Sequence, residues 1–180
     1  MKELLIKLNA CNEAREWASN KSIDEIWATC HRGDWMLWLA RKLDIDKRVL
    51  TLAKGHCANT VRHLMKDERS IAAVDMAIKY GEGNATDSEL AAAADAAYDA
   101  TADAYDAAAD DAYAADYAAA AAAAYATAAY AAAAAYAAAA YDATADADAR
   151  KQSQQATAEI CRKYIPLDLI LSGIKSQEKI

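Results

Sequence analysis

The stretch ELAAAADAAYDATADAYDAAADDAYAADY, residues 89–117, decides the fold of this chain. It belongs to a low-complexity tract over residues 85–149, in which 39 of the 65 positions are alanine and neither glycine nor proline occurs. Alanine has the highest helix propensity of all residues, so the tract predicts helix throughout. One straight helix would reach roughly 100 Å at about 1.5 Å per residue, which is far outside the usual range. We therefore expect the tract to fold back at least once, with residues 110–111 and 142–148 as candidate bends.

The sequence on either side of the tract has an ordinary mixed composition. Residues 1–84 predict several short helices that end at a Gly-Glu-Gly-Asn linker over 81–84, and residues 150–180 predict a C-terminal helix. The whole chain of 180 residues contains one proline and five glycines, too few for the many turns of an all-β fold. We predict an all-α protein in which a mixed segment (1–84) and the tract with its C-terminal helix (85–180) pack as one compact unit.

Capping residues place the helices of the first segment. Ser22 followed by Glu25 three residues later predicts a capping box at the start of a helix. Gly33 is expected to break that helix. The next predicted helices span 35–43, 47–66 and 68–80, the first two capped by Asp34 and Asp46.

Residues with catalytic or metal-binding chemistry are few. The cysteines are widely spaced and form no CxxC motif, and the N-terminus has no signal-peptide layout, so they predict reduced core thiols in a cytoplasmic protein: Cys11, Cys30, Cys57 and Cys161. The three histidines, two of them beside cysteines, match no zinc spacing: His31, His56 and His63. There is no glycine-rich phosphate loop, no nucleophile motif and no apolar run long enough to span a membrane. We expect no enzyme activity, no cofactor, no metal and no membrane partner.

Charge is strongly segregated along the chain. The tract holds eleven aspartates, one glutamate and no lysine or arginine, a charge of −12, whereas the remainder carries +5 and the total is −7. Five aspartates are spaced by 4, 4, 3 and 4 residues and fall within roughly an 80° arc of a helix at ~100° per residue: Asp95, Asp99, Asp103, Asp106 and Asp110. This stripe predicts either an acidic face that binds a basic groove, including one built for DNA or RNA, or a solvated face that keeps the protein soluble.

Four tryptophans lie within residues 17–38. Trp35 and Trp38 are three residues apart and so share one helix face, and Trp17 and Trp27 precede them. Such a cluster indicates core packing or, alternatively, a partly exposed hot spot for a partner.

The sequence resembles a known family, the immunity-protein-five-like proteins of bacteria and their phages. The similar positions cover about residues 10–170 and include Cys11, Ala14, Trp17, Ile26-Trp27, Cys30, the block Asp34-Trp35-Met36-Leu37-Trp38-Leu39, the tract, Ile160-Cys161-Arg162 and Ile165-Pro166. The resemblance implies a helical protein without catalytic activity that neutralises a toxin by binding it. It carries over no functional residues.

Three functional hypotheses follow. The first is an inhibitor that binds a basic nuclease, toxin or CRISPR effector through the acidic stripe, as an immunity protein or a phage anti-defence (anti-CRISPR) protein. The second is a nucleic-acid-binding protein that uses the basic remainder, for example Arg41, Lys42, Lys47, Arg48, Lys54 and Arg62. The third is a structural or assembly protein whose Ala/Tyr helices pair between chains.

Overall fold

Every regular element is helical in the computed structural model, which describes residues 1–65, 67–106 and 147–177. The α-helices are α1 (Lys2–Lys7), α2 (Asn12–Trp17), α3 (Ile23–Thr29), α4 (Gly33–Lys42), α5 (Lys47–Asn59), α6 (Glu68–Gly81), α7 (Asp87–Asp106), α10 (Ala147–Tyr164) and α11 (Leu167–Gln177). A short 3-10 helix spans Arg62–Leu64. The predicted all-α class is confirmed.

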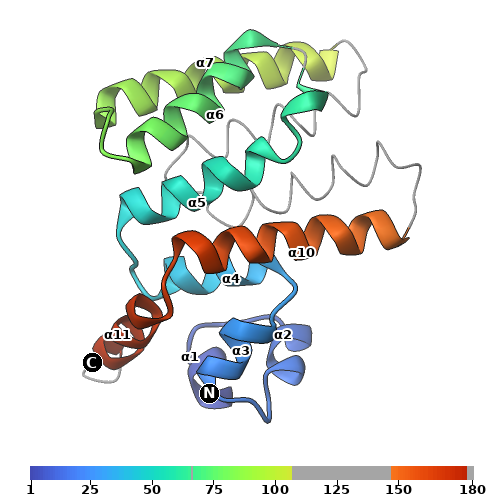
Figure 1. Cartoon of the computed structure of the whole chain (residues 1–180), viewed down its shortest axis with the longest axis vertical. Coiled ribbons are helices and arrows are strands. Elements are labelled where there is room, and N and C mark those ends of the chain that lie inside the picture. The colour runs from blue at the N-terminus through green and yellow to red at the C-terminus, as the bar shows by residue number, and fades with distance from the viewer. Residues whose placement is uncertain (66, 107–146, 178–180) are drawn as a thin grey trace.

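The helices are stacked along the longest axis of the molecule (Figure 1). Helices α7, α6 and α5 follow one another from one end, and α10 packs against both α5 and α4 in the middle. The short helices α1, α2 and α3 form a small N-terminal lobe at the other end, where α11 contacts α3. None of the described helices has the length and apolar character needed to cross a bilayer.

Local capping signals set several helix starts as predicted. The Ser22 hydroxyl accepts from the Glu25 backbone N–H while the Glu25 carboxylate accepts from the Ser22 N–H, which completes the capping box. Asp46 caps α5 by accepting from the amides of Arg48 and Val49.

The predictions for Gly33 and Asp34 are wrong. Helix α3 ends at Thr29, four residues before Gly33, and Gly33 instead begins α4. Its lack of a side chain permits a close crossing, because a Cβ there would lie 2.6 Å from Thr157 Oγ1 on α10. Asp34 makes no cap, since both of its oxygens accept from the Arg32 guanidinium at 2.9 and 2.7 Å.

The helix predicted over 47–66 stops early. Helix α5 ends at Asn59, and Thr60 turns its hydroxyl back onto the Cys57 carbonyl at 2.7 Å. That bond satisfies one of the acceptors that a helix end leaves without an amide partner. The turn lets Val61 and Met65 point into the interior.

The core joins the two predicted segments. The hydrophobic positions that α4, α5 and α10 contribute without exposed surface are Leu37, Ala40, Ala53, Cys57, Ala58, Ala158 and Cys161. Three cysteines are buried and unbridged, as predicted, but Cys11 is exposed because it precedes α2 at the surface. Burial raises the pKa of Cys30, and contact with the Cys57 thiol together with burial raises that of Cys161. The predicted bend at 110–111 lies outside the described residues, and of 142–148 only 147 and 148 are described, at the start of α10.

Candidate protein-binding surfaces

The first candidate surface is the outer face of α7. Leu90, Ala94 and Ala97 are buried on the side where α7 packs against α6. Asp95 and Asp99 lie on the opposite side and are exposed, because they are turned by roughly 140° and 180° from Leu90 at ~100° per residue. Neither carboxylate forms an ion pair within the described part of the chain. The two aspartates therefore present their charge to solvent.

The other stripe positions are less completely described. Helix α7 continues through Asp103 and Asp106, so its backbone keeps both on the helical repeat of Asp95 and Asp99. Asp110 lies outside the described residues. The structure thus brings four of the five predicted positions onto one helix.

The acidic residues that begin α7 have structural partners instead. Asp87 binds the Lys47 ammonium and accepts from the Tyr80 hydroxyl at 3.1 Å, and the Lys47 contact lowers the pKa of Asp87. Glu89 accepts from the Thr86 amide and hydroxyl at 2.8 and 2.7 Å, and its own amide donates to the Thr86 hydroxyl at 3.2 Å, which forms a capping box at the start of the helix. The acidic face that is available to a partner therefore begins at Asp95 and does not include Asp87 or Glu89.

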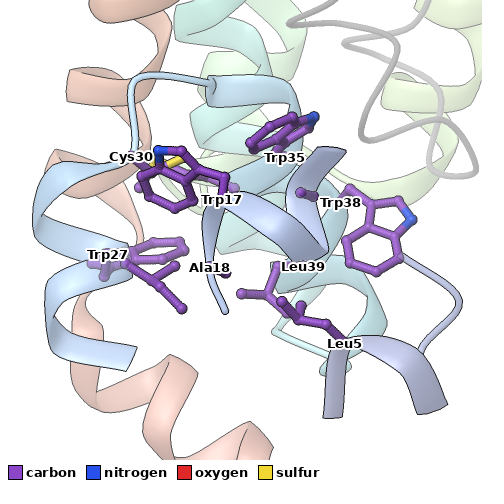
Figure 2. Close-up of a pocket in the computed structure, with 11 residues that line it drawn as sticks. Leu5, Trp17, Ala18, Trp27, Cys30, Trp35, Trp38 and Leu39 are labelled. Carbon is purple, nitrogen blue, oxygen red and sulfur yellow. The ribbon is translucent and has the colours of Figure 1, made fainter. Parts of the chain in front are cut away.

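The second candidate surface is an apolar hollow in the N-terminal lobe, called the tryptophan pocket here. It has a cavity of about 40 Å³, and only apolar residues and a cysteine line it: Leu5, Ala14, Trp17, Ala18, Ile26, Trp27, Cys30, Trp35, Met36, Trp38 and Leu39. Figure 2 shows Trp17, Trp27 and Cys30 on one side of it and Trp38, Leu39 and Leu5 on the other. Trp35 and Trp38 reach it from one face of α4, as their spacing predicts, while the contributions of α1, α2 and α3 depend on tertiary packing.

Cations sit against the half-buried rings of this pocket. Lys21 Nζ lies 4.1 Å from the ring centroid of Trp17, and Arg32 Cζ lies 4.5 Å from that of Trp35. Lys42 Nζ lies 6.0 Å from the Trp38 centroid, at the outer limit of a cation–π contact. The Trp17 and Trp35 rings are themselves 6.1 Å apart and tilted by 59°.

The back of the pocket is anchored to the main stack by Arg162. This α10 side chain donates to the Cys30 carbonyl at 2.7 Å and to the Trp27 carbonyl at 3.4 Å. Both carbonyls belong to the end of α3, where backbone acceptors lack amide partners. One guanidinium from a distant part of the sequence therefore fixes α3, and with it Trp27, against α10.

The basic residues considered for nucleic-acid binding do not form one exposed surface. Lys54 is only 1% exposed, and burial lowers its pKa to about 7, with Arg41 and Lys47 adding to the shift. Arg48 donates to the carbonyls of Tyr80 and Ala85. Arg62 pairs with the two oxygens of Asp75 at 2.5 and 2.9 Å, and Lys47 pairs with Asp87. Arg41 and Lys42 are the two exposed members of the set.

The histidines lie in separate places. His31 packs edge-on against Trp17, with centroids 6.3 Å apart, and His56 stacks on Tyr164 at 4.2 Å. Burial, followed by the Lys163 charge, lowers the pKa of His56. Over residues 1–65, 67–106 and 147–177, no three potential ligands come close enough to hold a metal ion.

Comparison with known proteins identifies no relative: no family model, curated protein or solved structure matches this chain. The resemblance to the immunity proteins therefore stays a prediction.

Proposed function

We propose that this protein is a non-catalytic inhibitor that binds a basic site on another protein through the outer face of α7. The observation that carries the proposal is the exposure of Asp95 and Asp99, without ion-pair partners among the described residues, directly opposite the buried side of their helix. A face that served only for solubility would not need its charges in one row of a single sign. A row of like charges also destabilises its own helix modestly.

The target class follows from complementary charge. A row of carboxylates about 6 Å apart along a helix axis matches a groove that binds a polyanion, as in a nuclease, a nucleic-acid-handling toxin or a CRISPR effector. Such charges accelerate encounter with a basic partner and disfavour wrong partners. The resemblance to immunity proteins supports a protective role against such an enzyme.

The nucleic-acid-binding alternative has less support. Binding to the phosphate backbone requires exposed cations that can contact several phosphates at once. Of the six basic residues considered, Lys54 is buried and three are engaged in contacts within the chain: Lys47 with α7, Arg48 with the end of α6, and Arg62, on the 3-10 helix, with α6.

The test compares two variants with the same change in charge. In the face variant, Asp95, Asp99, Asp103, Asp106 and Asp110 all become Asn. In the control variant, five acidic residues outside the tract become amides: Glu3, Asp24, Asp44, Glu159 and Asp168. Tagged wild-type protein first captures partners from a bacterial lysate containing defence nucleases and toxins. Each captured basic enzyme is then purified and its inhibition measured.

We expect the face variant to lose inhibition by at least about tenfold, and the control variant to retain it. Binding should weaken when salt rises to about 1 M, where the Debye length is ~3 Å. Equal inhibition by the face variant and the wild type would show that the stripe does not bind the target.

A further inference from the structure

Two lysine ammonium groups lie against rings of the tryptophan pocket, and one of them, Lys21, is near enough to Glu25 for its charge to help lower the pKa of that carboxyl. Lys21, whose ammonium donates to the Trp17 carbonyl, and Lys42, which lies beside Trp38, have no ion-pair partner within the described residues. By contrast Arg32, over Trp35, is paired with Asp34 at 2.7 Å. The pocket therefore suits an apolar anchor that has carboxylates beside it.

Helix α7 carries an anchor of this kind. Tyr98 is 41% exposed and, among residues 1–63, 65, 67–100 and 151–177, only Ile6 matches it as an exposed large apolar side chain. Asp95 and Asp99, both exposed, precede and follow it on the helix, and all three fall within roughly a 100° arc. An aromatic ring bordered by two carboxylates complements an apolar hollow bordered by two ammonium groups.

The two surfaces cannot meet within one molecule. Helix α7 lies at one end of the longest axis and the lobe that holds the pocket lies at the other (Figure 1). We propose that a second copy of this chain covers the tryptophan pocket, with the Tyr98 ring lying across its opening and Asp95 and Asp99 facing Lys21 and Lys42.

This contact joins different surfaces of the two copies, so it is head-to-tail, and each added copy presents a free face and a free pocket. It also covers the α7 face proposed to bind the target, so self-association and target binding exclude each other. The inference does not depend on the identity of that target, and the self-association test below uses no target.

The test is sedimentation velocity of the full chain from micromolar to millimolar concentration. In this experiment the face variant carries the single substitution Tyr98→Ala, in place of the five aspartate substitutions described above, and its control is Ile6→Ala. The pocket variant is Lys21→Glu with Lys42→Glu, and its control of equal charge change is Lys151→Glu with Lys175→Glu, two exposed lysines elsewhere.

We expect the wild type and both controls to self-associate, and the face and pocket variants to do so at least about tenfold more weakly. A mixture of the two weakened variants should form a one-to-one pair and stop there, because each retains one intact surface.

Three outcomes would overturn the proposal. One is a wild type that stays monomeric at millimolar concentration, including the case in which the pocket instead binds an acidic segment of another protein. Another is association that the face and pocket variants leave unchanged. The last is a mixture of those variants that stays monomeric while wild type associates.

Discussion

Replacing Gly33 with alanine would place a methyl group where α4 and α10 cross. The new Cβ would lie 2.6 Å from Thr157 Oγ1 and 2.7 Å from the Thr157 carbonyl carbon, whereas ordinary contact begins at 3.4 Å. The helices would have to separate by about 0.7 Å, because a backbone atom cannot rotate away as a side chain does.

Forcing a methyl group into a packed interface costs about 1–3 kcal/mol, and the helix propensity gained over glycine returns at most about 1 kcal/mol. Part of that gain is lost at Gly33, which is the first residue of α4. We expect a net loss of about 2 kcal/mol and a fall in Tm of about 4–8 °C for a chain of this size.

The measurement is urea unfolding followed by far-UV circular dichroism, with Asn20→Ala at an exposed site as the control. Adding Thr157→Ala should recover less than half of the loss, because the Thr157 carbonyl carbon and Cβ both remain at 2.7 Å. A Gly33→Ala protein within about 0.5 kcal/mol of wild type would refute the close-crossing argument.

Three further predictions concern Arg162, Lys54 and the cysteines. Arg162→Ala should lower the free energy of unfolding by about 2 kcal/mol by removing charged hydrogen bonds to α3 carbonyls, and Arg162→Lys should recover part of it in the same urea assay. Burial lowers the pKa of Lys54 from 10.5 to about 7 in the folded protein. Between these two pH values the side chain is protonated in the unfolded chain and largely neutral in the folded one, so the free energy of unfolding should rise with pH across that window. Urea titrations of Lys54→Met should lack this rise. In native protein, a thiol reagent followed by mass spectrometry should label exposed Cys11 rapidly and the three buried cysteines only after denaturation.

The features that sequence predicted well are local ones. The capping box of Ser22 and Glu25 spans three residues, so its chemistry is complete before any helix packs. The exposure of Asp95 and Asp99 follows in the same way, because the helical repeat places Leu90 on the opposite side of α7.

The features that sequence missed depend on residues far away in the chain. From the sequence Gly33 is predicted to break a helix, whereas in the structure it allows the close approach of Thr157 on α10. Asp34 is predicted to cap a helix, whereas in the structure both of its carboxylate oxygens accept hydrogen bonds from Arg32. The tryptophan pocket needs four helices, and only the pairing of Trp35 with Trp38 is visible as a spacing.

The crossing of α4 and α10 also has a consequence for biosynthesis. The Cys161 thiol reaches the Gly33 carbonyl across 128 residues of sequence. At translation rates of about 5–20 residues per second, the ribosome needs roughly 6–26 s to make the intervening chain. During that interval the nascent α4 and α5 lack the helix that covers Leu37 and Cys57. A chaperone that binds exposed apolar surface would therefore act on α4 and α5 in this interval, before α10 is synthesised.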